Sequence, residues 1–318
     1  MHLTSFFSRT IICIKEVISI ENLLKDCHLC PRRCSINRYE MTGYCGAGAE
    51  ILGAKACLHQ WEEPCISYKN GAGTVFFSGC GLHCKFCQNN MISNEIKGKM
   101  LTVPELADVF LRLCGEGADS IELVTPTHFV PQIISALDRV KHRLEVPVIW
   151  NSGGYELPET IRLLNGYIDV YLPDIKYYSP QVSAKYSNAP DYFEYTSSAV
   201  IAMINQVGSL TYNDEGGLVR GTIIRHLVLP SHRHDSMKIL DWIAENTSPE
   251  NVLLSLMSQY TPFDHVPDDC PELRRRVTKM EYNSVVRHAD ELGLKGFMQE
   301  KTSASAEYVP DFDFSGLH

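Results

Sequence analysis

The sequence predicts an α/β fold, a partial (β/α)6 barrel that follows a small cysteine-rich N-terminal cap. Two observations lead to this prediction. From about residue 73, short apolar and β-branched runs alternate with amphipathic segments, whereas the first 72 residues combine clustered cysteines with little helical periodicity. A chain of 318 residues, 44% of them hydrophobic, can build a core of barrel size.

Six runs are predicted as strands because they are rich in Val, Ile and Leu without strict alternation, which is typical of strands buried on both faces. They span residues 74–77, 120–125, 146–151, 169–174, 222–229 and 252–257. Segments with an apolar spacing of about 3.6 residues are predicted as helices over 103–114, 131–140, 158–164, 184–208, 235–246 and 279–292. This alternation implies a parallel sheet with right-handed crossovers, which we expect to curl into a barrel.

The same pattern divides the chain into three regions. Residues 1–72 form the expected metal-binding cap, residues 73–260 the barrel, and residues 261–318 a C-terminal helix and tail. In β/α barrels the chemistry lies at the carboxyl ends of the strands, where loops vary on a rigid scaffold. Polar residues at the strand ends are therefore the candidates for function.

Charge and composition exclude several function classes. A formal net charge of −9 argues against nucleic acid as a partner, because such binding needs clustered Lys and Arg. No stretch reaches membrane-spanning length, so we expect no membrane partner. Arg9, Lys15 and Glu16 interrupt the apolar N-terminal stretch and no small-residue cleavage site follows it. We therefore expect no secretory signal and a cytoplasmic location.

The strongest motif follows the first predicted barrel strand. Cys80, Cys84 and Cys87 have the spacing C-x3-C-x2-C in a tight loop. Thiolates ligate iron–sulfur clusters, and three of them leave one iron of a [4Fe-4S] cluster open to another ligand. The loop therefore predicts a [4Fe-4S] cluster, with Phe86 beside it in the cofactor site. The alternatives are a zinc knuckle, which usually takes four ligands, and three small buried cysteines.

A second group of cysteines lies in the cap. Cys27, Cys30, Cys34 and Cys45 have the spacing C-x2-C-x3-C-x10-C, which predicts a second metal site. Spacing alone leaves zinc, iron and a second Fe-S cluster open, because thiolates suit all three. A histidine such as His28 could replace one thiol.

Several stretches together resemble the radical SAM proteins similar to pyruvate formate-lyase activating enzyme, in the branch of activating-enzyme homologues. The resemblance covers most of the chain. It is carried by the cluster loop through Ser93 and by Cys27-His28-Leu29-Cys30-Pro31-Arg32-Arg33-Cys34, His59-Gln60-Trp61-Glu62-Glu63-Pro64, Leu123-Val124-Thr125-Pro126-Thr127-His128, Tyr171-Leu172-Pro173-Asp174-Ile175-Lys176-Tyr177, Arg225-His226-Leu227-Val228-Leu229-Pro230 and Met257-Ser258-Gln259-Tyr260.

The resemblance implies an enzyme that cleaves S-adenosylmethionine (SAM) reductively at the cluster and so makes a 5′-deoxyadenosyl radical for hydrogen abstraction. It further implies an electron donor such as flavodoxin or ferredoxin. In activating enzymes the hydrogen comes from a glycine of a glycyl-radical protein. A different protein or a small-molecule substrate is the first alternative, and a non-catalytic Fe-S or zinc protein is the second.

The strand ends supply the expected SAM-binding residues. The second strand departs from the family, because Thr125, Thr127 and His128 stand where many members have a Gly-Gly-Glu motif that binds the SAM amino group. Hydroxyl and imidazole groups can make comparable polar contacts. Asn151 and Ser152 close the third strand, before a Gly-Gly turn that could admit a ligand or be a plain turn.

Charged groups end the fourth strand and occupy the fifth. Alternation points Asp174 and Lys176 to the same face, where they pair near SAM or form an ion pair at the rim. Arg225 could pair with a carboxylate of SAM or Asp174, or form a structural salt bridge. Gln259, at the exit of the sixth strand, could touch the ligand or belong to an ordinary loop. Glu62 and Glu63 are expected to be surface acids unless they reach the mouth of the site.

Overall fold

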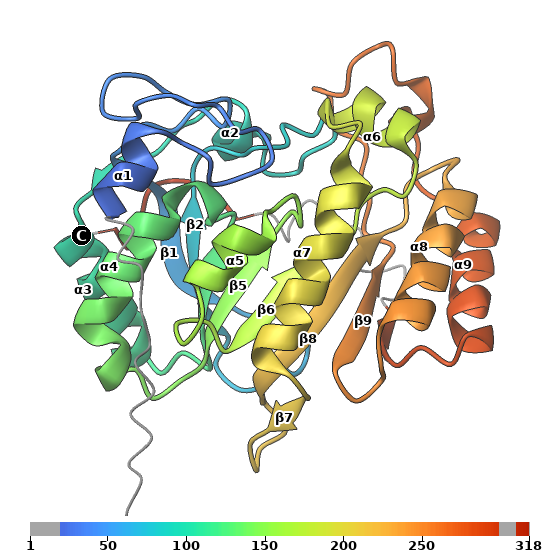
Figure 1. The fold of residues 1–318 in the computed structure, drawn as a ribbon. Coiled ribbons are helices and arrows are strands. Elements are labelled where there is room, and N and C mark those ends of the chain that lie inside the picture. Colours follow the sequence, from blue (N-terminus) through green and yellow to red (C-terminus); the bar gives the residue numbers. More distant parts are fainter. Residues whose placement is uncertain (1–19, 299–309, 318) are drawn as a thin grey trace, which may run out of the picture.

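A ten-stranded sheet forms the centre of the part of the chain that the computed structural model describes, residues 20–298 and 310–317 (Figure 1). Its order is β10-β9-β8-β6-β5-β4-β2-β1-β3, with β7 paired to β8. The strands are β1 (Ile51–His59), β2 (Ala72–Phe77), β3 (Lys99–Leu101), β4 (Ile121–Val124), β5 (Val148–Ser152), β6 (Val170–Pro173), β7 (Thr211–Tyr212), β8 (Leu218–Leu227), β9 (Val252–Met257) and β10 (Gly296–Met298). The neighbouring strands β2, β4, β5, β6, β8 and β9 are paired parallel to one another. This confirms the predicted α/β fold.

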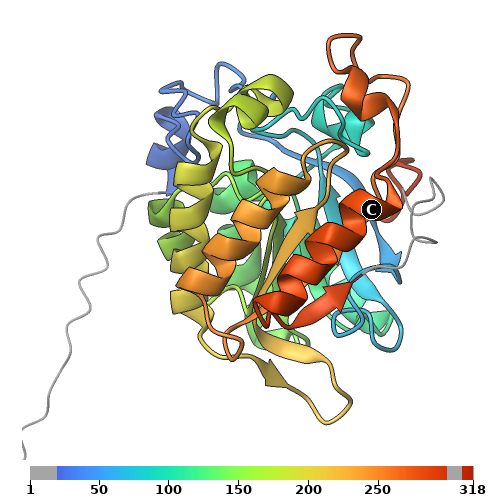
Figure 2. The ribbon, with the colours of Figure 1, turned by 90° about the vertical axis from the view of Figure 1, so that its right-hand side faces the viewer.

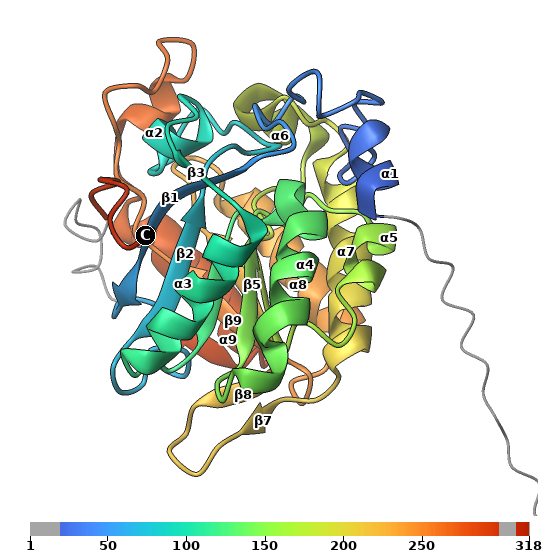
Figure 3. The same cartoon turned by 90° about the vertical axis from the view of Figure 1, so that its left-hand side faces the viewer.

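Most helices cover the outer face of this sheet, while α2 and α6 lie over the carboxyl ends of its strands (Figure 1). They are α1 (Ile20–Lys25), α2 (Asn90–Ser93), α3 (Val103–Gly115), α4 (Val130–Val140), α5 (Pro158–Leu163), α6 (Pro180–Ser187), α7 (Tyr192–Val207), α8 (Arg233–Asn246) and α9 (Lys279–Glu291). Figure 2 shows α8 and α9 together at one side, and Figure 3 shows α3 and α4 against the sheet at the other.

One predicted helix is two helices in the structure. The segment 184–208 was expected to be continuous, but α6 ends at Ser187, and the residue that caps it, Asn188, has φ 47° and ψ 41° in the left-handed region. Pro190 follows two residues later and cannot continue the hydrogen-bonded ladder. The break lets α6 lie over the carboxyl ends of the strands while α7 packs along the sheet (Figure 1).

The sheet extends into residues that the sequence pattern placed in the cap. Strand β1 pairs antiparallel with β2, and β3 pairs antiparallel with β1. The C-terminal segment 310–317 then lies beside β1, where the amides of Phe314 and Ala56 donate to the carbonyls of Ala54 and Ser315. Figure 3 shows this segment next to β1. Covering β1 in this way protects the edge of the sheet.

The sheet interior is closed at one end. Apolar side chains from the amino-terminal halves of the strands and from the segment after β1 form a plug there: Cys65, Ile66, Ala72, Ile149, Val170, Leu172, Leu218 and Ile223. Because side chains alternate along a strand, the next inward positions on β5 and β8 are Asn151 and Arg225. The interior therefore changes from apolar to polar toward the carboxyl ends.

Two segments discussed in the sequence analysis lie largely outside the residues that the structure describes. The N-terminal stretch, in which we expect no secretory signal, lies almost entirely outside the described residues, as does most of the tail after β10. Among the helices of residues 20–298 and 310–317, none has the length and apolarity that a membrane span requires.

A capping box at the start of α9 yields a stability prediction. Glu281 accepts hydrogen bonds from the Thr278 amide at 2.8 Å and from Arg275 at 2.8 Å. The Arg275 bonds hold the pKa of Glu281 well below its usual range. We expect Glu281→Gln to lower the free energy of unfolding by about 1 kcal/mol at neutral pH, since solvent screens the 42% exposed Arg275.

The pH dependence of this effect has a definite sign. Because the folded-state pKa of Glu281 is depressed, its contribution is present above the usual glutamate pKa of about 4.3 and is lost as the pH falls through the folded value. Urea unfolding curves of the protein and the variant should converge in acid. A difference that stays constant with pH would contradict this assignment.

Candidate active site

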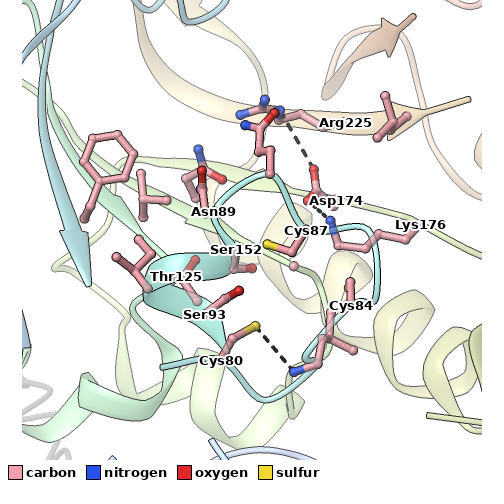
Figure 4. Close-up of a pocket in the computed structure, with 18 of the residues that line it drawn as sticks. Cys80, Cys84, Cys87, Asn89, Ser93, Thr125, Ser152, Asp174, Lys176 and Arg225 are labelled. Carbon is pink, nitrogen blue, oxygen red and sulfur yellow. Dashed lines mark hydrogen bonds and ion pairs between the residues drawn. The ribbon is translucent and has the colours of Figure 1, made fainter. Parts of the chain in front are cut away.

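The loop after β2 carries the C-x3-C-x2-C motif. It leaves the sheet at Gly79, whose φ of 97° suits glycine and whose added side chain would meet the Cys45 carbonyl oxygen at 2.7 Å. The Cys80 amide donates to that carbonyl at 3.1 Å. Cys80, Cys84 and Cys87 all line one cavity of about 200 Å³ at the carboxyl ends of the strands (Figure 4).

Buried donors surround the sulfur of Cys84. Ser187 Oγ donates to Cys84 Sγ over 3.0 Å, and Tyr177 OH lies 3.8 Å from the same sulfur and 2.7 Å from Ser187 Oγ. Burial, reinforced by the neighbouring thiols, raises the pKa of Cys80 to about 12 and also raises the pKa of Cys87. Ionised sulfurs in this position need compensating positive charge, which iron ions would supply.

Phe86, within the cysteine loop, packs against three tyrosines that together form an aromatic wall. Its ring makes edge contacts with Tyr177, Tyr186 and Tyr260 at centroid distances of 6.3, 6.1 and 6.0 Å. Edge-to-face packing of this kind fixes ring positions. The wall gives one side of the cavity a rigid apolar surface.

The structure brings most of the expected strand-end residues to the same cavity. These are Thr125, Asn151, Ser152, Asp174, Lys176, Arg225 and Gln259, in addition to Phe86. Figure 4 shows several of them across the cavity from the cysteine loop. They come from five different strands or the loops directly after them, so the parallel sheet alone places them together.

Lys176 and Asp174 form an ion pair in this cavity. Burial would lower the pKa of Lys176, but the charges of Asp174 and Cys84 outweigh it and hold that pKa above its usual value. Lys176 therefore stays cationic. Asp174 also faces Arg225, whose Nε lies 3.8 Å from Asp174 Oδ1.

Thr127 and His128 do not line this main cavity. Thr127 Oγ1 donates to the buried Glu156 at 2.7 Å, and the His128 ring lies 2.8 Å from the Ser78 carbonyl oxygen. Burial lowers the pKa of His128 to about 3, so its ring is neutral. The hydroxyl of Ser152 is likewise engaged, since it donates to Glu156. These side chains hydrogen-bond to other groups of the protein, which their positions at the strand ends did not predict.

The expectation that Glu62 and Glu63 are surface acids is wrong. Both side chains are buried, at 9% and 5% exposure, because Arg225 reaches them from β8. Arg225 Nη1 lies 3.1 Å from Glu62 Oε2, and Arg225 Nε lies 3.5 Å from Glu63 Oε1. Burial, and then repulsion from Glu122, raise the pKa of Glu62 well above its usual value.

Comparison with known families agrees with this geometry. The family model described as the radical SAM superfamily matches residues 74–243, from the first barrel strand into α8. The chain belongs to the radical SAM superfamily. The uncharacterized protein MJ0674 of Methanocaldococcus jannaschii is 30% identical to this radical SAM protein over 283 residues, 86% of this chain and 77% of that protein.

Solved structures show a more distant likeness. A radical SAM methyltransferase from Sphaerobacter thermophilus has 12% identity and a TM-score of 0.47, with coverage of 71% of this chain and 66% of that one. A domain of a pyruvate-formate lyase-activating enzyme from Bacteroides vulgatus has 11% identity and a TM-score of 0.37, with coverage of 54% and 93%.

The residues of this radical SAM protein fit the cofactors that the family implies, a [4Fe-4S] cluster and SAM. Asn89 and Ser93, which the sequence analysis missed, line the cavity near Cys87 (Figure 4). Asn89 Oδ1 is buried and has no hydrogen-bond partner within the described chain, whereas the Ser93 hydroxyl faces the Cys87 thiol. A buried polar atom without a partner is costly unless a ligand satisfies it. The polar run Gln88-Asn89-Asn90 directly after the third cysteine was the available signal.

Thr125 marks a strained point in the same site. Its φ of 56° lies in the left-handed region, which a β-branched residue rarely adopts. Its position is where the resemblance places a glycine-rich motif. Strain of this kind is often found at ligand sites.

The cap thiols lie close to the cluster loop. Cys30 and Cys45 line a small cavity of about 30 Å³ together with Cys80. Burial, together with the charges of Cys45, Cys27 and Cys34 and against an opposing backbone hydrogen bond, raises the pKa of Cys30 to about 12. Within residues 20–298 and 310–317, no three His, Cys, Asp or Glu side chains converge as ligands of a single metal ion.

The donors around Cys84 lead to a prediction about redox potential. Hydrogen bonds to a cluster sulfur stabilise the more negative reduced state and so raise the potential. We expect Ser187→Ala to lower the midpoint potential by an amount on the order of tens of millivolts. Redox titration followed by electron paramagnetic resonance measures it. Ser183→Ala, on the same helix, is the control, and an equal potential in both variants would contradict the assignment.

Proposed function

We propose that this radical SAM protein binds one [4Fe-4S] cluster through Cys80, Cys84 and Cys87, binds SAM in the adjoining cavity, and abstracts hydrogen from a protein or peptide. The observation that supports this most is that three thiols from one loop share a cavity with the strand-end ion pairs. The chemistry that the bound cofactors supply is electron transfer to the SAM sulfonium, which yields methionine and a 5′-deoxyadenosyl radical.

The chain's own residues bind SAM and orient it in the cavity. Lys176 stays cationic and is suited to a carboxylate, while Asn89 offers a free polar atom at the cavity wall and Ser93 lies against the Cys87 thiol. The wall around Phe86 excludes water from one side of the site. Asp174 positions Lys176 through their ion pair.

Within the superfamily we favour the activating-enzyme branch. The motif matches along most of the chain support it, and they imply a glycyl-radical protein as substrate and flavodoxin or ferredoxin as electron donor. The test is a candidate partner deuterated at its glycine α-carbons, with mass spectrometry of the 5′-deoxyadenosine formed. Deuterium in this product would support the branch. Unlabelled product would assign a different protein or small-molecule substrate, and no product at all would contradict SAM cleavage.

We further propose that Cys27, Cys30, Cys34 and Cys45 hold a second iron–sulfur cluster rather than zinc. Ligands of a four-iron cluster occupy separate corners of a cube, so they need not converge as zinc ligands do. The described cysteines are all free, which fits a reducing, cytoplasmic compartment.

Iron and zinc content test this second site. We expect roughly eight irons per chain after anaerobic reconstitution, falling to roughly four in Cys34→Ala. Cys57→Ala, on β1, serves as the control and should keep the full content. Roughly four irons together with one zinc would identify a zinc site instead, and roughly four irons without zinc would leave the cap thiols metal-free.

A further inference from the structure

The wall of the cavity away from the cysteine loop carries more negative than positive charge. Glu62, Glu63, Glu122 and Asp174 contribute four carboxylates around Arg225, all of which interact electrostatically with its guanidinium. Lys176, the second cation, is paired with Asp174. Two of the four carboxylates therefore have no cation of their own when all groups are ionised, and buried charges without a counter-ion are costly.

The partners of these carboxylates confirm the deficit. Glu122 is satisfied by neutral donors, Thr74 Oγ1 at 2.9 Å and Asn151 Nδ2 at 2.7 Å. Glu63 Oε2 is buried and has no hydrogen-bond partner in the described chain. Glu62 Oε1 has His59 Nε2 at 3.8 Å, beyond hydrogen-bond distance. Each of the two glutamates that follow β1 thus has one carboxylate oxygen near Arg225 and one without a hydrogen-bond donor from the described chain.

Of the two glutamates, Glu62 is the one that a ligand in the cavity can contact. Its side chain lines the cavity, together with His59, Arg225 and the cluster cysteines. Burial also lowers the pKa of His59, so that ring is neutral and adds no positive charge. The raised pKa of Glu62 favours its protonated form when no ligand is bound, and a cationic group of a molecule in the cavity would instead supply the charge that keeps it ionised.

We propose that the substrate presents an ammonium or guanidinium group, and that Glu62, which lines the cavity, binds it, while Glu63 lies behind it against Arg225. The inference rests on the proposed function, in which the same cavity holds SAM beside the cluster. A cationic group there would supply the missing charge and hydrogen-bond donors, and it would orient the adjoining carbon–hydrogen bond toward the cofactor side. The cation can belong to a free amine or to a lysine or arginine of a peptide.

The first experiment uses a matched pair of probes that needs no variant. Binding of n-butylammonium and of the neutral n-butanol to the reconstituted holoenzyme with SAM is measured by calorimetry. We expect heat of binding for butylammonium and none for butanol. Equal binding of both, or of neither, would overturn the proposal. Displacement of butylammonium by rising SAM concentration would also overturn it, because the carboxylates would then serve SAM itself.

A second experiment tests the residues and the source of the cation. Glu62→Gln should weaken butylammonium binding roughly tenfold, whereas Glu250→Gln, at an exposed turn, should not. Unchanged affinity in Glu62→Gln would contradict the assignment. The tripeptides Gly-Lys-Gly and Gly-norleucine-Gly distinguish the sources: tighter binding of the lysine peptide than of butylammonium identifies a peptide, and weaker binding identifies a free amine.

The outcomes separate this inference from the proposed function. Formation of 5′-deoxyadenosine by the unmodified enzyme with dithionite and SAM, without any amine, tests SAM cleavage alone. Product without butylammonium binding would overturn the substrate inference only. Butylammonium binding without product would overturn the proposed function.

Discussion

Cys84→Ala is expected to abolish SAM cleavage. Cys84 is the most enclosed of the three loop cysteines, and its sulfur accepts the Ser187 hydrogen bond. With two loop thiols left, we expect the iron content of the first site to be lost. Formation of 5′-deoxyadenosine should fall by at least a hundredfold, more than the roughly 10–100-fold loss typical of changes around a metal's ligands.

Cys114→Ala is the matched control, because Cys114 lies on the outer helix α3 and packs at the edge of the main core. That variant should keep both its iron and its activity. Iron analysis and chromatography of the reaction products measure both quantities. Retained cluster and product in Cys84→Ala would contradict the assignment of the loop.

Arg225→Met is expected to cause a large loss of stability. Arg225 faces Glu62, Glu63 and Asp174 in the sheet interior, and methionine keeps part of its apolar volume while removing its charge. Removing one partner of a buried charged group typically costs about 3–5 kcal/mol. We expect a loss of that order in the free energy of unfolding at neutral pH, measured by urea denaturation.

The loss should shrink as the pH falls. Without Arg225 the carboxylates have raised folded-state pKa values, so the folded variant takes up protons more readily than the unfolded chain and gains stability in acid. Adding Glu62→Gln to Arg225→Met should recover part of the loss. Arg139→Met, an exposed site on α4, is the control. If Arg225→Met were as stable as Arg139→Met, the Arg225 guanidinium would not be needed to stabilise the buried carboxylates.

Local sequence patterns predicted the main sheet well. The six expected strands correspond to β2, β4, β5, β6, β8 and β9, because each is an apolar run whose burial on both faces needs no information from elsewhere. Strand β1 was missed, since its run contains Gly53 and three alanine or cysteine positions and shows little β-branched character. Its formation depends on pairing with β2 and on cover by the tail.

The site residues likewise fall into those that the local sequence predicted and those that only the fold brought together. The sequence by itself determined the cysteine loop and the Asp174–Lys176 pair, because spacing along one loop or one strand decides which side chains share a face. Only the tertiary structure decided that Thr127 serves Glu156, and that Glu62 and Glu63 lie buried against Arg225. Arg225 is 163 residues from Glu62 along the chain. Such burial depends on which distant charges the fold brings together, and no local pattern records that.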